Sequence, residues 1–187
     1  NKYMGEIHNL AINGNIKGIK KALSQMTNKK VFLSPDKELG WSPMHYASHH
    51  SKAKIVQLML DAGITPNIKS VPPEKKKQND WNLALEEDNS DKTPIVYPMD
   101  VAEGPNRTKI INNLIKKGGK FYGEDLNLHQ AVQMQDIDEI ECLLEDDSIK
   151  INTRDVRGWM AIHYAVEMNN LEIVKLLLEN KANINGS

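Results

Sequence analysis

Hydrophobic positions along the chain cluster into pairs of short segments. The segment 40–47 reads GWSPMHYA and precedes an apolar run at 55–60, while 158–165 reads GWMAIHYA and precedes a similar run at 173–178. In both pairs ten residues separate the histidine from the start of the run (45 to 55, 163 to 173). A helix this apolar is not stable alone in water, so each pair predicts two short antiparallel helices that stack on neighbouring pairs.

Three weaker copies of this pattern begin at Glu6, Tyr97 and Asn127. Residues 68–91 then form an insertion between the second and third copies, and we expect 186–187 to be an added tail. The five copies divide a single domain, 1–185, into repeats of approximately 4–33, 37–67, 92–120, 121–153 and 155–185.

These segments resemble the ankyrin repeat, with its Thr-Pro-Leu-His-x-Ala opening and its Ile-Val-x-Leu-Leu-Leu second helix. The 34 residues from His129 to His163 are close to the period of that family, about 33 residues. The resemblance implies an all-α solenoid of about five stacked helix-turn-helix units with protruding turns and one long inter-repeat insertion. It also implies that His8, His45, His129 and His163 are structural, with rings that hydrogen-bond to the backbone of the turns.

Local signals agree with these helix boundaries. Ser42 is a good helix N-cap, and Pro43 then occupies the first helical position, where a missing N–H is harmless. Gly63 and Gly118 follow apolar runs and can end a helix in the left-handed conformation. In the third copy Gly104-Pro105 departs from the pattern, and we expect it to bend or shorten the first helix.

Charge and cysteine content narrow the function classes. The net charge is -1, from 24 Lys+Arg and 25 Asp+Glu, whereas dedicated nucleic-acid binders carry a basic face. No run of about 18 apolar residues occurs, so no membrane span is expected. A single cysteine favours a reducing compartment, and we therefore expect a cytoplasmic protein.

No recognised catalytic or metal-binding motif occurs in the sequence, so we expect no enzyme activity, no cofactor and no metal. The adjacent His49 and His50 point about 100° apart on a helix and cannot share a metal in the manner of an i, i+4 pair. Cys142 lies in an apolar stretch, at a position that we expect to be buried and inert. Lys75-Lys76-Lys77 is followed by acidic residues and is typical of a solvated loop.

The resemblance also implies a binding surface, because ankyrin-like proteins hold partners with their concave face and turn tips. Trp41 and Trp159 have two alternative roles: contact with a partner, or cover for their own turn and the neighbouring repeat. Carried over position by position, the expected protein-binding residues are Leu39, Trp41, His49, His50, Tyr122, Met134, Arg157, Trp159 and Met168.

The sequence thus predicts a monomeric, non-catalytic module that binds a protein partner and no nucleic acid. An alternative is that it is the recognition or regulatory segment of a larger enzyme whose catalytic domain lies elsewhere. Its Lys- and Asn-rich style resembles ankyrin proteins of intracellular bacteria, which are delivered into host cells as effectors, and those of some protists. In that setting the partner is a host protein. The insertion contains Trp81-Asn82-Leu83-Ala84-Leu85, which is expected to form a short helix that tucks against the array. Insertions in repeat proteins often lie on the binding face.

Overall fold

The computed structural model describes residues 5–27, 29–73 and 94–183. Over these residues the chain is all-α, as predicted, with nine α-helices, one 3-10 helix and no strand. The helices are α1 (Glu6–Ile12), α2 (Ile16–Gln25), η1 (Lys29–Leu33), α3 (Pro43–His49), α4 (Ala53–Asp61), α5 (Arg107–Lys116), α6 (Asn127–Met134), α7 (Ile137–Leu144), α8 (Ala161–Glu167) and α9 (Leu171–Glu179).

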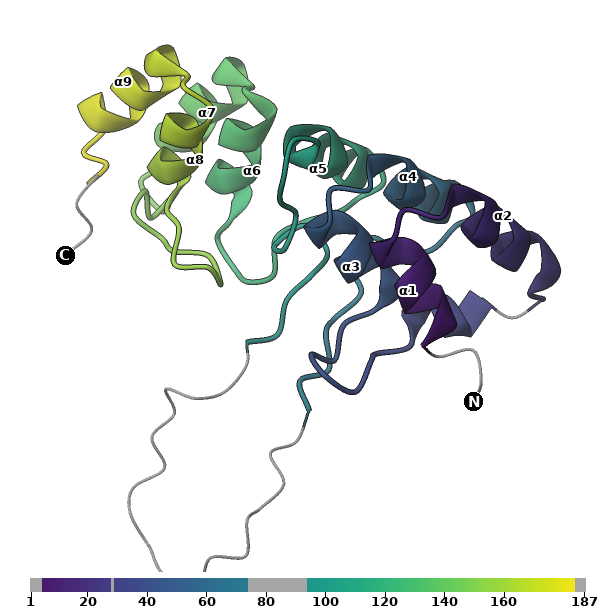
Figure 1. Cartoon of the computed structure of the whole chain (residues 1–187). Helices are drawn as coiled ribbons and strands as arrows, with labels where there is room; N and C mark the ends of the chain where they lie inside the picture. Colours follow the sequence, from purple (N-terminus) through teal and green to yellow (C-terminus); the bar gives the residue numbers. More distant parts are fainter. Residues whose placement is uncertain (1–4, 28, 74–93, 184–187) are drawn as a thin grey trace, which may run out of the picture.

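The helices stack into a single row of five units, with the first and last units at opposite ends (Figure 1). Units 1, 2, 4 and 5 are the antiparallel pairs α1–α2, α3–α4, α6–α7 and α8–α9, and unit 3 contains α5. First helices pack on first helices, α1 on α3 and α6 on α8, while α4 packs between α2 and α5. This arrangement confirms the expected solenoid.

One continuous hydrophobic core runs through the row. The apolar run 55–60 places Ile55, Val56, Met59 and Leu60 inside, as its composition requires. The last helix is less covered, because Ile173 and Leu177 are buried whereas Leu171 is 74% exposed. Burial therefore depends on a neighbour on each side, which is the general property of stacked repeats.

Helix ends follow the local signals in the sequence. Ser42 is the N-cap of α3, and its N–H donates to Nδ1 of His45 over 3.1 Å. Pro43 follows at the first helical position. Gly63 and Gly118 each have a φ of +81° just after α4 and α5 respectively, so both end their helices in the left-handed conformation.

The third unit has no first helix, so the expectation of two helices in every unit is wrong there. Residues 98–101 make only a single turn before Gly104, at φ +81°, and Pro105. Proline has no N–H and its ring clashes with the carbonyl four residues earlier, so the helix does not extend. The N–H of Glu103 instead donates to the carbonyl of Ser48 in α3, at 3.2 Å.

The described residues on either side of 74–93 are bonded to each other. The N–H of Ser70 donates to the carbonyl of Val96, and the N–H of Val96 donates to Oγ of Ser70 (3.0 and 2.9 Å). The expected short helix at 81–85 and the solvated loop at 75–77 lie outside the described residues.

Cys142 is exposed, so the expectation of a buried thiol is wrong. Helix α7 buries Ile140 and packs Leu143 and Leu144 against the core. A residue two positions after Ile140 points about 200° away from it and therefore faces solvent. In the run 173–178 the equivalent position is held by Lys175, which agrees with a solvent-facing site.

The turn glycine at position 40 is expected to tolerate no side chain. Gly40 has φ +70°, and a Cβ there would lie 1.7 Å from the carbonyl oxygen of Val71. Gly40→Ala should lower the free energy of unfolding by roughly 3 kcal/mol or more, from the left-handed conformation and the clash together. Gly63→Ala is the matched control: its φ is +81°, no described atom lies within 4 Å, and a loss of about 1–2 kcal/mol is expected. Urea unfolding compares the two, and equal losses would contradict the close approach at position 40.

Exposure of Cys142 predicts that its thiol is accessible in the folded protein. An aromatic disulfide reagent should react with the folded chain within about tenfold of the rate in denaturant, because burial is the usual protection of a structural cysteine. If the thiol of the folded chain reacts many orders of magnitude more slowly than in denaturant, Cys142 is buried after all and this prediction is wrong.

Candidate functional site

A cleft of about 290 Å³ opens on the side of the turns, beside the position where the third unit lacks its first helix. Residues of three units meet there: the turn before α3, the 94–103 segment of unit 3, and the turn before α8. The apolar part of the lining consists of Leu39, Trp41, Pro94, Val96, Val101 and Val156. Its polar part consists of His49, Asp100, Glu103 and Arg157.

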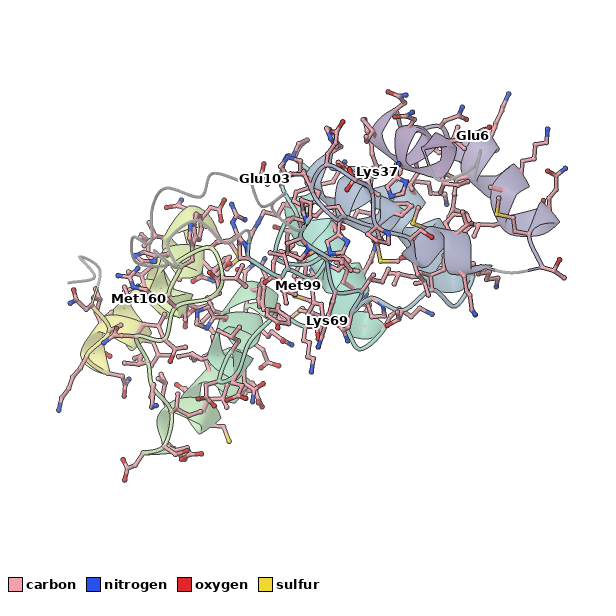
Figure 2. All side chains as sticks on the ribbon, turned by 90° about the horizontal axis from the view of Figure 1, so that it is seen from below. Glu6, Lys37, Lys69, Met99, Glu103 and Met160 are labelled. Atoms are coloured by element: carbon pink, nitrogen blue, oxygen red, sulfur yellow. The ribbon has the colours of Figure 1, made fainter. Side chains whose placement is uncertain are left out.

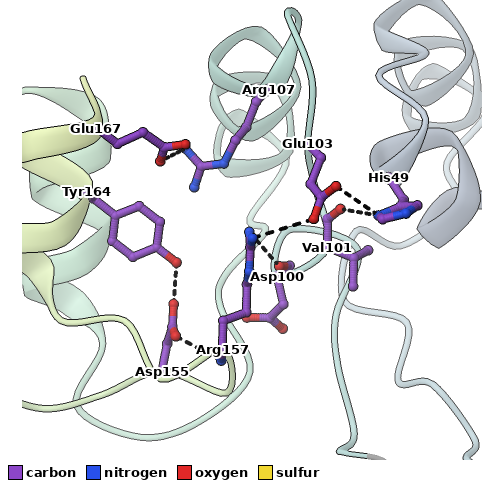
Figure 3. A network of polar contacts seen from close by, with 9 residues as sticks. All are labelled: His49, Asp100, Val101, Glu103, Arg107, Asp155, Arg157, Tyr164 and Glu167. Carbon is purple, nitrogen blue, oxygen red and sulfur yellow. Dashed lines mark hydrogen bonds and ion pairs between the residues drawn. The ribbon is translucent and has the colours of Figure 1, made fainter. Parts of the chain in front are cut away.

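The polar residues form a rim around the carboxylate of Glu103, which lies near the middle of the array (Figure 2). Nδ1 of His49 is 3.6 Å from Oε2 of Glu103 and 3.3 Å from the carbonyl oxygen of Val101. On the other side, Nη2 of Arg157 is 3.5 Å from Oε1 of Glu103 (Figure 3). One half-exposed carboxylate is thus shared between a histidine of unit 2 and an arginine of unit 5.

The two walls of the cleft are stiffened by the same turn design. In unit 2, Asp36 Oδ1 accepts from the N–H of Trp41 at 2.9 Å, and Oδ2 accepts from the hydroxyl of Tyr46 at 2.5 Å. In unit 5, Asp155 accepts from the N–H of Trp159 and from the hydroxyl of Tyr164. Short polar side chains that bond to their own turn hold it in one conformation, so the walls are preformed.

These turn bonds also shift the titration of the groups that make them. Burial alone would raise the pKa of Asp36, but the hydrogen bonds from Tyr46, Trp41 and Leu39 outweigh it, and the pKa is lowered. Burial, together with the neighbouring carboxylate, raises the pKa of Tyr46 and of Tyr164. Both tyrosines therefore stay phenols at neutral pH, and each hydroxyl donates to the aspartate of its own turn.

Histidine rings join units 1, 2 and 4 each to the following unit. Nε2 of His8 donates to the carbonyls of Ser34 and Trp41, both at 3.0 Å, and Nε2 of His129 donates to the carbonyl of Trp159 at 2.9 Å. His45 does the same to Val96 at 2.9 Å, while its Nδ1 accepts from Ser42. These contacts confirm the structural role expected for His8, His45 and His129, and Nδ1 of His163 accepts from the N–H of Met160 within its own unit at 2.9 Å.

Comparison with known families agrees with this repeated geometry. A family model described as "Ankyrin repeats (3 copies)" matches residues 98–187, and one described as "Ankyrin repeat" matches residues 39–71. Together the two matches cover more than half of the chain.

The chain belongs to the ankyrin-repeat family. Ankyrin repeats are in general protein–protein interaction modules.

Individual relatives share parts of this ankyrin-repeat chain. A fowlpox virus protein named as an ankyrin repeat protein is 38% identical over 61 residues, which are 33% of this chain and 9% of the relative. A protein of Rickettsia bellii named in the same way is 27% identical over 177 residues, or 86% of this chain and 24% of the relative. Alpha-latrocrustotoxin-Lt1a of Latrodectus tredecimguttatus is 28% identical over 92 residues, which are 48% of this chain and 6% of the relative. The chain thus spans about a quarter or less of the length of each of these three relatives.

In this ankyrin array Asp100 replaces the motif histidine and reverses the polarity of its bonds. A carboxylate only accepts, so Asp100 takes the N–H of Tyr97 at 2.7 Å and the N–H of Tyr122 in the next unit at 3.1 Å. Burial raises the pKa of Asp100 to about 7, although both N–H bonds oppose the shift. Burial also disfavours the charged form of His45, but for histidine that form is the protonated one, so the pKa of His45 is lowered to about 4.

Four of the residues expected to bind a partner meet at the cleft: Leu39, Trp41, His49 and Arg157. Leu39 is 40% exposed, so part of its side chain is available for contact. Whether these residues contact a partner stays a prediction.

The other five expected binding residues lie outside the cleft lining. His50 is exposed at the end of α3, and the ring of Tyr122 packs edge-on against Tyr97 at 5.1 Å. Met134 lines a separate hollow of about 220 Å³ on the α6–α7 side. Met168 accepts a long contact from Gln133 (3.6 Å), and Trp159 packs behind Arg157 rather than into the cleft.

Both tryptophans are half-buried. Trp41 lies 5.2 Å from the ring of Tyr46 and 5.3 Å from that of His49, and Trp159 lies 5.0 Å from the ring of Tyr164. Each ring therefore covers its own turn, which favours the second of the two roles expected from the sequence. Trp41 additionally forms part of the cleft wall.

Sequence reasoning did not place Asp100, Val101 or Glu103 of unit 3 at a binding surface, although all three line the cleft. The repeat pattern places Asp100, Val101 and Glu103 in a first helix that Gly104-Pro105 was expected only to bend or shorten. The signal that could have found them is Gly104-Pro105, because a helix stopped there leaves the preceding residues in a loop.

The described part of the chain offers no site for a metal ion: no three His, Cys, Asp or Glu side chains within it are grouped as ligands. Nor does any helix in that part combine the length and apolarity needed to cross a membrane.

Asp100 is expected to give stability a characteristic pH dependence. Its folded pKa, about 7, lies above the usual 3.8, so its contribution is fully present below about pH 4 and is lost as the pH rises through 7. An asparagine at this position cannot titrate. The difference in unfolding free energy between wild type and Asp100→Asn should therefore fall, on the order of 1.4 kcal/mol per pH unit, between about pH 4 and 7. Urea unfolding at several pH values measures this difference, in which the contribution of His45 cancels. A difference that stays constant with pH would show that Asp100 is ionised throughout.

Proposed function

We propose that this ankyrin-repeat chain is a non-catalytic module that holds a protein partner at the cleft and the adjoining turn tips. The observation that carries the proposal is the lining: an apolar wall that includes Leu39 and Trp41 next to a rim formed by His49, Glu103 and Arg157. Aromatic, aliphatic and arginine side chains inside a polar rim are typical of protein–protein interface cores.

The preformed walls support the same proposal. The turns that carry Leu39 and Arg157 are fixed by Asp36 and Asp155, whose side chains accept from the backbone of their own turns. A surface that is ordered before binding loses less conformational entropy when a partner arrives, so its contacts yield more affinity. The extent of the cleft, about 290 Å³, suits one or two anchoring side chains of the partner rather than a large ligand.

The setting of this activity is part of the proposal. The single cysteine fits a reducing compartment, and we place the module in a cytoplasm. Similarity over 86% of the chain to a Rickettsia bellii protein is compatible with a bacterial effector that binds a host protein in the host cell.

Leu39→Asp tests the site with a closely matched control. Leu39 and Leu33 are both 40% exposed, but only Leu39 lines the cleft. We expect Leu39→Asp to weaken the affinity for a partner at least about tenfold, because a carboxylate then replaces an apolar side chain in a cleft that Glu103 also lines. Leu33→Asp should change it by less than about twofold.

The partner is first captured on the wild-type chain through a photo-crosslinking residue at position 38 and then titrated against each variant by calorimetry. Melting temperatures of the two variants should agree. Equal affinities of Leu39→Asp and wild type would exclude the cleft as the binding site.

A further inference from the structure

Two arginines cross between unit 3 and unit 5 of the array. In stacked repeats each unit normally contacts only its immediate neighbours. Here Arg107, at the start of α5, reaches α8, where its Nη1 is 3.3 Å from Oε2 of Glu167. Its guanidinium carbon lies 5.0 Å from the centre of the Tyr164 ring, within the range of a cation–π contact.

Arg157 crosses in the opposite direction, from the turn before α8 to unit 3. Its Nη2 is 3.5 Å from Oε1 of Glu103, and its Nη1 is 3.5 Å from the carbonyl oxygen of Asp100. The guanidinium also lies 5.3 Å from the ring of Trp159, which fixes its direction. Both arginines thus connect the same two units, one from each side (Figure 3).

The missing helix of unit 3 explains how these side chains reach so far. Unit 4 contributes only α6 between them, and its Gln133 accepts from Nη1 of Arg107 at 3.1 Å. First helices pack on the first helices of neighbouring units elsewhere in the array, α1 on α3 and α6 on α8, so a first helix over 98–104 would lie beside α6. Its absence opens a direct path from unit 3 to unit 5.

The burial of Arg107 makes its contacts obligatory. The residue is only 9% exposed, and a guanidinium stays charged at any physiological pH. A buried charge without partners is strongly unfavourable. The guanidinium of Arg107 therefore keeps its three contacts, with the carboxylate of Glu167, the amide of Gln133 and the ring of Tyr164. Lysine has neither the planar fork nor the stacking surface that these three partners use.

We propose that Arg107 and Arg157 form a strap that couples unit 3 directly to unit 5, so that these units open together and the cleft keeps a fixed width. Glu103 and Arg157 are themselves part of the cleft rim, so the strap and the rim share residues. The coupling between the units does not depend on what the cleft binds. It is a mechanical property of the array and can be measured on the chain alone.

A double-mutant cycle tests the coupling. Arg107→Met keeps the apolar stem and removes the charge, while Glu167→Gln removes the partner charge at a half-exposed position where folding is tolerant. Each single change should raise the equilibrium constant for unfolding at least about fivefold, and the double variant should exceed the larger single effect by less than about twofold. If the effects of the two single changes on the unfolding constant multiply in the double variant, Arg107 and Glu167 are not coupled and the proposal fails.

Hydrogen exchange then separates the strap from ordinary stabilisation. Arg107→Met, in unit 3, should raise the exchange of α8 amides at least about fivefold, and Glu167→Gln, in unit 5, should raise that of α5 amides. The control is Lys175→Met, which breaks the exposed pair of Lys175 and Glu179 within α9 (3.9 Å) and should leave α5 unchanged. Unchanged α5 exchange in Glu167→Gln would overturn the proposal, even if the variant is less stable overall.

Discussion

The array depends on one buried contact that recurs between units. The residue at the histidine position of the Thr-Pro-Leu-His-x-Ala motif bonds to the backbone of the turn that opens the next unit. His8, His45 and His129 donate this bond to a carbonyl of the next unit. Each ring is buried, and a buried donor without an acceptor costs about 1–3 kcal/mol. The following turn is therefore held where its carbonyl meets the ring, which fixes the spacing of the units as well as their stability.

The one exception to this contact among these units organises the candidate site. The side-chain oxygens of Asp100 accept from an N–H of the next unit, that of Tyr122, whereas the histidines donate to a carbonyl. The same unit loses its first helix at Gly104-Pro105. These two departures lie within six residues of each other (100 to 105), and together they leave the space in which the cleft opens and the two arginines cross. A break in a regular fold is a frequent place for function.

Much of this fold could be read from residues at fixed offsets. The helix pairs of units 2 and 5, the N-cap at Ser42 and the left-handed ends at Gly63 and Gly118 all formed as expected, because each depends on local backbone preferences. The burial expected for Cys142 was wrong because a short apolar stretch does not by itself define which side of a helix is covered. Of the cleft residues, Leu39, Trp41, His49 and Arg157 were anticipated, and Val101 and Glu103 were not.

The sequence by itself determined the repeat and most of its helices, since these follow from periodicity, and the resemblance to the ankyrin repeat implied the structural histidines. Only the tertiary structure decided which residues of distant units meet. Arg157 and Glu103 are 54 positions apart in the chain (157 against 103), and nothing in their local context pairs them. Their contact exists because unit 3 leaves out a helix and side chains of units 3 and 5 extend across that space, which is a property of how the units stack rather than of any one unit.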